Sequence, residues 1–60
     1  MKIEELKKFG IGTEIKINDE LYTLKYTLWT NSLMFWGKER AYTLKAVSEM
    51  NFKVIKAVYK

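Results

Sequence analysis

The sequence predicts a mainly β domain that begins with a short helix. Its 60 residues, of which 48% are hydrophobic and 30% charged, are enough for one small domain and too few for two, so a single domain spans 1–60. The hydrophobic residues have helical spacing near the N-terminus and alternate with polar residues from Thr13 onward. Small clusters of Asn, Asp, Gly and Ser interrupt the alternation, as expected for strands joined by turns.

The first predicted element is a helix over residues 2–9. Ile3, Leu6 and Phe9 fall near one side of this helix. Acidic residues lie in its first turn, basic residues lie in its last turn, and Gly10 follows it. Two turns are too short to persist alone in water, so we expect the apolar side to pack on a sheet.

A β-hairpin is predicted over residues 13–30, with a two-residue loop at Asp19-Glu20. A three-residue loop would place the other face of the second strand against the core, because successive side chains of a strand point to opposite faces. The two-residue loop is preferred because it sets apolar residues opposite apolar residues and an acid opposite a base. The resulting pairs are Ile17 with Tyr22, Ile15 with Leu24, and Glu14 with Lys25.

A second turn at Asn31-Ser32 predicts a second hairpin, in which Leu28 lies opposite Phe35 and Trp29 lies opposite Met34. Both faces of this hairpin are apolar. One face carries Tyr22, Leu24, Tyr26, Leu28 and Phe35. The other face carries Leu21, Trp29, Met34 and Trp36, interrupted by Thr23, Lys25 and Thr27.

The C-terminal third contains a turn at 37–39, a short strand through Ala41 and Tyr42, and an ambiguous segment over Thr43–Asn51. Alternation permits a strand in that segment. We favour a helix, because Thr43 is a good N-cap and Asn51 is a good left-handed residue for a helix end. The last strand is predicted over 52–59, with a bulge near Val54 because the apolar residues change face there.

Together these elements predict a small antiparallel β-barrel or a strongly bent sheet of the Src-homology-3-like (SH3-like) kind, in which a helical turn often precedes the final strand. The alternative is an α+β fold, an open antiparallel sheet with a helix at about 38–50 packed on one face.

Missing residue types exclude most catalytic chemistry. The chain has no Cys and no His, so it lacks thiolate nucleophiles, the commonest general base and the usual transition-metal ligands. We therefore predict no enzyme activity, no catalytic residues, no metal site and no cofactor. The longest apolar stretch, 33–36, is far too short to span a membrane. The acidic residues Glu4 and Glu5 stand where a signal peptide would be apolar, so we expect a cytoplasmic protein without a membrane partner.

Two segments, EELKKFGIGTEIKIN at 4–18 and YTLKAVSEMNFKVI at 42–55, resemble the two ends of small uncharacterised proteins found in phages and prophages of Gram-positive bacteria. The shared positions are of the kind that form strands, turns and caps, so the resemblance implies no site residues. It implies a viral accessory protein of a group that often acts by binding and blocking a host protein.

The candidate protein-binding face consists of Trp29, Met34 and Trp36, with Leu21 and Lys25 further along it. These residues are expected either to be buried by the N-terminal helix or barrel closure, or to form an exposed apolar patch with Lys at its rim. In the second case the partner is a host protein or a second copy of the chain, as a homodimer. A domain this small, without disulfide or metal, gains most from such a partner.

The alternative function is a nucleic-acid-binding small β-barrel. Eleven basic and seven acidic residues leave a net charge of +4, which favours polyanionic partners. Arg40 is the only arginine, so sequence-specific reading of a duplex is not expected. Aromatic side chains would stack on bases. The phosphates would be neutralised by Lys16, Lys25, Lys38, Arg40 and Lys53.

Overall fold

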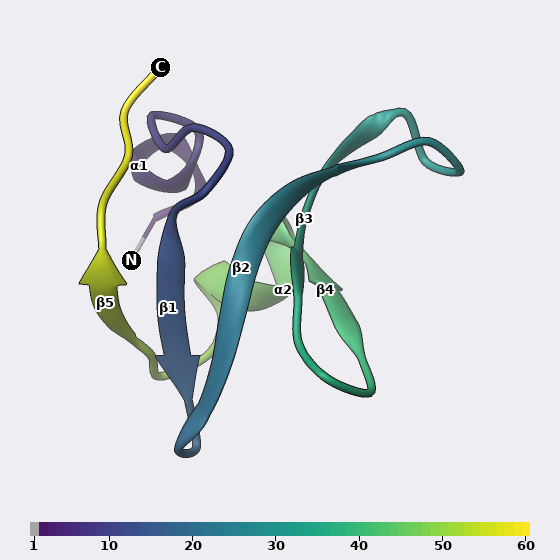
Figure 1. Cartoon of the computed structure of the whole chain (residues 1–60). Helices are drawn as coiled ribbons and strands as arrows, with labels where there is room; N and C mark the ends of the chain where they lie inside the picture. The colour runs from purple at the N-terminus through teal and green to yellow at the C-terminus, as the bar shows by residue number, and fades with distance from the viewer. Residues whose placement is uncertain (1) are drawn as a thin grey trace.

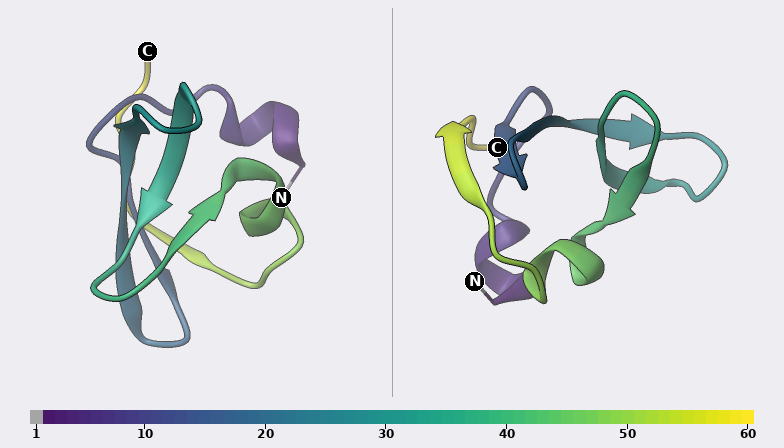
Figure 2. Two further views of the ribbon diagram at one scale, coloured as in Figure 1. Left: turned by 90° about the vertical axis from the view of Figure 1, so that its right-hand side faces the viewer. Right: turned by 90° about the horizontal axis from the view of Figure 1, so that it is seen from below.

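The structure, a computed structural model, describes residues 2–60 and contains one five-stranded antiparallel sheet and two short helices (Figure 1). The elements are α1 (Ile3–Leu6), β1 (Glu14–Ile17), β2 (Glu20–Thr27), β3 (Ser32–Trp36), β4 (Ala41–Thr43), α2 (Leu44–Ser48) and β5 (Lys53–Lys56). The strand order is β4-β3-β2-β1-β5, and the sheet is strongly bent (Figure 2). The predicted mainly β class and bent sheet are confirmed. Within residues 2–60 the sheet is not a closed barrel, because β4 and β5 are its two edges.

The β1–β2 hairpin has the two-residue loop that the sequence predicts, one position earlier in the chain. The loop is Asn18-Asp19, with φ of 50° and 65°, and Ile15 pairs with Tyr22. The predicted pairing of Ile17 with Tyr22 is therefore wrong, as are the other two pairs of that register. A type I′ turn needs two residues with positive φ, which Asn and Asp tolerate better than Glu. The shift preserves the face of every side chain, because it moves the register by an even number of positions.

Replacing Asp19 by Gly is expected to raise the free energy of unfolding by up to about 1 kcal/mol, because Gly adopts positive φ without steric cost. Asp19→Ala is the matched control and is expected to lower stability, since Ala lacks the polar side chain that makes this conformation tolerable. Urea denaturation of the three proteins measures both changes. A loss of stability in Asp19→Gly would contradict the turn assigned to this hairpin.

The β2–β3 hairpin has a longer loop than the sequence predicts. Leu24 pairs with Phe35, and Thr27 pairs with Ser32, so the loop is the four residues 28–31. The predicted pairing of Leu28 with Phe35 and of Trp29 with Met34 is wrong. The chain instead turns through a loop that ends at Asn31, whose φ is 55°. Leu28 and Trp29 consequently belong to the hairpin tip and not to β2.

The favoured helix in the C-terminal third is confirmed as α2. The backbone N–H of Ala46 donates to Thr43 Oγ1 at 3.1 Å, so Thr43 is the predicted N-cap. The alternative helix at about 38–50 does not form, because Ala41–Thr43 pair with β3 as strand β4. Asn51 is not left-handed; the helix instead ends at Ser48 and is followed by the C-cap residue Glu49, whose φ is −95°. Within residues 2–60, no helix combines the length and apolar character needed to cross a membrane.

Both ends of the chain are less regular than predicted. Strand β5 contains the expected bulge: Val54 pairs with Ile15, Lys56 pairs with Glu14, and Ile55 is the extra residue between them. The strand ends at Lys56 instead of continuing to 59. Helix α1 likewise ends at Leu6, where the chain passes through a turn at residues 7–8 before Phe9 forms an isolated β-bridge with Tyr59.

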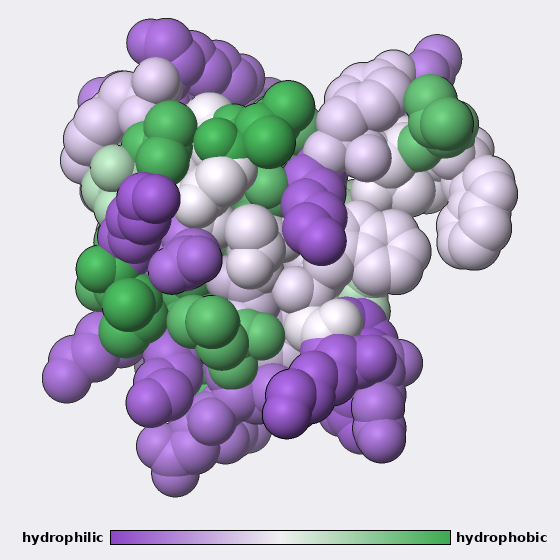
Figure 3. Space-filling model, viewed as in Figure 1, coloured by the Kyte–Doolittle hydropathy of each residue, from purple (hydrophilic) through white to green (hydrophobic). Residues whose placement is uncertain are grey.

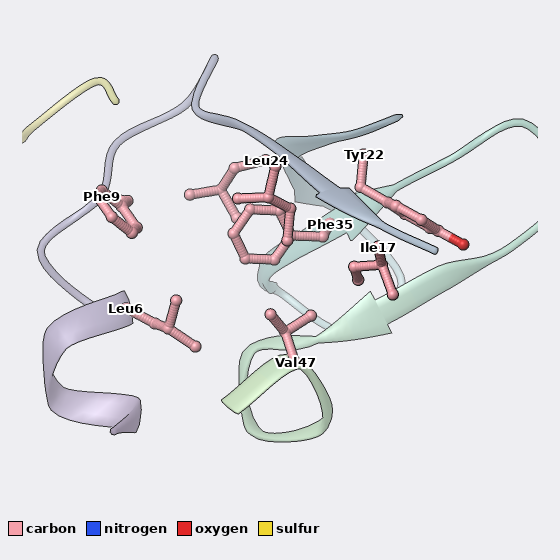
Figure 4. Close-up of a cluster of buried hydrophobic side chains, with 8 residues drawn as sticks. Leu6, Phe9, Ile17, Tyr22, Leu24, Phe35 and Val47 are labelled. Carbon is pink, nitrogen blue, oxygen red and sulfur yellow. The ribbon is translucent and has the colours of Figure 1, made fainter. Parts of the chain in front are cut away.

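The core lies inside the bend of the sheet, where the two helices cover it (Figure 4). Leu6 of α1 and Val47 of α2 point toward side chains from β1, β2 and β3. Burial of this cluster is what stabilises two helices that are too short to form alone. The buried residues are Leu6, Phe9, Ile15, Ile17, Tyr22, Leu24, Phe35 and Val47.

Thr13 joins the two ends of the chain within the fold. Its side chain is fully buried, and Thr13 Oγ1 accepts the backbone N–H of Val58 at 3.0 Å. The carbonyl oxygens of Gly10 and Val58 both lie 2.9 Å from the same Oγ1, so the hydroxyl can donate its proton to either carbonyl. One hydroxyl thus satisfies buried polar groups of two segments that are far apart in sequence.

Candidate functional site

The tip of the β2–β3 hairpin projects from the body of the domain (Figures 1 and 2). It carries two adjacent apolar residues, Leu28 and Trp29, which are 82% and 90% exposed. In the space-filling view, this arm stands away from the rest of the surface and carries one green, hydrophobic group near its end among pale side chains (Figure 3). Adjacent exposed apolar side chains of this size are uncommon on a small monomeric domain unless another molecule covers them.

A hollow of about 300 Å³ lies at the tip, lined by Tyr26, Thr27, Leu28, Trp29 and Trp36. Trp36 Nε1 donates to Thr27 Oγ1 at 2.9 Å, and Thr27 is only 5% exposed. The hydroxyl of Tyr26 donates to the side-chain oxygen of Asn31. Two of the three aromatic walls are therefore held in place by hydrogen bonds before any ligand arrives.

The structure brings some of the predicted protein-binding residues together and separates others. Trp29 and Trp36 both line the hollow. Met34 is half-buried, with its Sδ 3.6 Å from Thr30 Oγ1, and Lys25 lies exposed directly opposite Met34. Leu21 is 46% exposed but lies at the other end of β2, so it does not belong to the hairpin tip.

Sequence reasoning missed three residues of the hollow. Tyr26 and Leu28 were placed by alternation on the same face as Leu24, and Thr27 was treated as an interruption of the opposite face. In the structure Tyr26 is 49% exposed, because the hairpin extends past the core at this point. The signal for a longer loop was the polar pair Thr30-Asn31 directly after Trp29.

The predicted nucleic-acid-binding residues do not form one continuous track. Lys16 of β1 and Lys53 of β5 lie directly opposite each other on the outer face of the sheet. Lys25 lies on the neighbouring strand β2, toward the hairpin tip. Lys38 and Arg40 lie in the loop between β3 and β4. Only the Lys16–Lys53 pair therefore concentrates positive charge at one place on the sheet.

Arg40 is hydrogen-bonded to one of two tyrosines whose rings are in contact near the β4 edge. Arg40 Nη1 donates to the Tyr42 hydroxyl at 3.3 Å, and the rings of Tyr22 and Tyr42 have centroids 5.4 Å apart. The hydrogen bond from the Arg40 guanidinium lowers the pKa of Tyr42 below that of a free tyrosine. Burial raises the pKa of Tyr22. The two rings thus ionise at different pH values although they are in contact.

In an ultraviolet absorbance titration, Tyr42 is expected to ionise below the ordinary tyrosine pKa and Tyr22 above it. Tyr42→Phe should remove the low transition. Arg40→Gln should move that transition to higher pH, because the neutral amide no longer favours the phenolate. Lys38→Gln is the matched control: it removes a positive charge from the same loop. An equal shift in both variants would contradict a specific role for the Arg40 hydrogen bond.

Comparison with known proteins found no matching family model, no similar curated protein and no similar solved structure.

Proposed function

We propose that this chain is a small non-catalytic protein-binding module that captures a partner protein with the tip of its β2–β3 hairpin. The observation that carries the proposal is the exposure of the adjacent Leu28 and Trp29 beside a preformed aromatic hollow. Exposed apolar patches on small soluble domains mark interaction sites, and Trp is enriched among the residues that dominate binding energy.

The proposed setting is the cytoplasm of a Gram-positive bacterium, where the module acts as a phage accessory protein that inhibits or adapts a host protein. The resemblance of segments 4–18 and 42–55 to phage proteins supports this setting. The proposed fold is SH3-like, supported by the strand order β4-β3-β2-β1-β5 and by the short helix between the last two strands.

Trp29 has few neighbours in the domain because it is 90% exposed, so its removal affects stability by less than about 0.5 kcal/mol. Removal of Trp36 is expected to affect stability more, because its indole is hydrogen-bonded to Thr27 and the residue is half-buried. Variants of the loop residues therefore separate binding from folding better than variants of Trp36 do.

The experiment is affinity capture from a Gram-positive lysate with the wild type and with the double variant Leu28→Ser/Trp29→Ser. We expect the wild type to retain a host protein that the double variant loses. Ile11→Ser is the matched control, because Ile11 is 62% exposed and lies outside the hairpin. Circular dichroism checks that all three proteins are folded.

Retention of the same protein by the double variant would overturn the proposal. Loss of the captured protein after nuclease treatment would also overturn it, and would favour the nucleic-acid-binding alternative. Sedimentation of the purified chain decides between a host protein and a second copy: a dimer that the double variant abolishes would make self-association the function of the tip.

A further inference from the structure

Beyond Glu20, the first residue of β2, the β2–β3 hairpin carries a single charged residue, Lys25. Residues 21–38 contain Lys25 and Lys38 and no Asp or Glu, and the nearest acids in sequence, Glu20 and Glu39, lie just outside this segment. An ordinary solvated surface mixes charges of both signs. The part of the hairpin that carries the aromatic hollow therefore has a cation, Lys25, as its one charge, and this favours a negatively charged ligand.

Lys25 is the cation closest to the hollow along the sheet. It pairs with Met34, and this pair lies between Trp36 and Thr27 in the strand register. Trp36 and Thr27 are joined by a hydrogen bond at 2.9 Å, so the indole passes along the same face that carries Lys25. Lys25 does not line the hollow, but it lies two residues from Thr27 on the same face of β2, so its positive charge disfavours a cationic ligand there.

The hollow has room for one anchoring side chain and not for a large ligand. Its volume of about 300 Å³ is at the lower end for binding pockets, and its lining is mostly aromatic and apolar. The hydrogen bonds of Trp36 and Tyr26 fix two of its walls. An apolar or aromatic side chain of a partner fits this combination of size and lining.

A nucleic acid fits the same surface less well. Binding along a phosphate backbone requires several cations in series, and Lys25 stands alone beside the hollow. The Lys16–Lys53 pair lies at the level of Leu21. At about 3.3 Å per residue, Leu21 is roughly 20 Å along β2 from Thr27.

We propose that the hairpin tip recognises an acidic peptide segment of its partner, in which an apolar or aromatic residue fills the hollow and a neighbouring Asp or Glu pairs with Lys25. This inference rests on the proposed protein-binding function and specifies the chemistry of the partner. The carboxylate contributes specificity and association rate, and the anchor contributes most of the affinity.

The test is selection of randomised peptides displayed on a carrier, with the whole wild-type chain as bait and the Leu28→Ser/Trp29→Ser variant as counter-selection. We expect enrichment of peptides with an apolar or aromatic residue beside Asp or Glu. Trp29→Ala should weaken a selected peptide by about thirtyfold or more, the size of a binding hot spot.

The role of Lys25 is tested by charge exchange. Lys25→Glu should weaken binding of the selected acidic peptide by about threefold to tenfold, and by more at low salt. The same variant should bind a peptide that has Lys in place of the acid more tightly than the wild type does. Lys45→Glu on α2 is the matched control, because Lys45 is exposed and lies outside the hairpin. Equal effects of the two substitutions, or no recovery on charge exchange, would overturn the proposal.

Each other result of the selection also decides the matter. Enriched peptides that compete for the tip but lack acids would overturn the acidic segment and leave the protein-binding function intact. No enrichment at all would overturn the peptide proposal. Tighter binding of a single-stranded thymidine oligonucleotide than of the best peptide, measured at the same salt concentration, would assign the tip to nucleic acid instead.

Discussion

Thr13→Val is expected to lower the free energy of unfolding by about 1–3 kcal/mol, because it leaves the half-buried Val58 N–H without its acceptor, while the carbonyls of Gly10 and Val58 keep their backbone donors. Valine has nearly the same shape as threonine, so the loss reports on hydrogen bonds and not on packing. A domain of 60 residues has only a few kcal/mol of stability in total. Chemical denaturation at 25 °C should therefore show a largely destabilised protein.

Thr13→Ser is the control for this substitution. Serine keeps the hydroxyl and removes one buried methyl group, and we expect a loss of about 1 kcal/mol. Hydrogen exchange at the Val58 amide supplies a local measurement: protection should fall in Thr13→Val and persist in Thr13→Ser. A smaller loss in Thr13→Val than in Thr13→Ser would show that the hydroxyl does not hold the C-terminal segment.

Gly37→Ala is expected to lower the free energy of unfolding by about 1–3 kcal/mol through overpacking. A Cβ atom at Gly37 would lie 2.6 Å from Cε2 of Tyr22, a distance at which one of the groups must move. The Tyr22 ring has little freedom to move, because it is buried in the core and packs against Tyr42. Thermal or urea denaturation measures the loss.

The double variant Tyr22→Leu/Gly37→Ala separates this contact from other effects of alanine. If the tyrosine ring causes the loss, Gly37→Ala should cost much less when Tyr22 is already leucine. Additive losses in the double variant would assign the role of Gly37 to its backbone and not to the approach of the ring.

The sequence predicted the faces of the strands better than their registers. Both hairpin registers were wrong, by two and by four positions, yet Ile15, Tyr22, Leu24 and Phe35 all face the core as alternation required. Alternation determines a face, whereas register depends on which residues occupy the loop. The N-cap of α2 was predictable because capping is local to Thr43 and the residues that follow it.

The candidate site was predictable only in part, for a different reason. Trp29 and Trp36 were identified from their residue type, and both line the hollow. Tyr26 and Leu28 were assigned to the wrong surroundings because periodicity does not show where a strand leaves the core. The contact between Gly37 and Tyr22 joins the β3–β4 loop to β2 and depends on the bend of the sheet, which no local pattern in the sequence encodes.

In the sheet, strand β1 lies between two strands. One of them, β2, follows β1 directly in the sequence, and the other, β5, comes from the far end of the chain. The other strand pairs join consecutive segments and close short loops, at small entropic cost. Pairing of Lys16 with Lys53 closes a loop of most of the chain, so it is expected to form late in folding. Until then, β1 presents a bare edge of backbone N–H and C=O groups. A newly synthesised molecule is thus expected to expose β1 to other chains until its last strand has docked, after which the open edge on this side of the sheet is the four-residue strand β5.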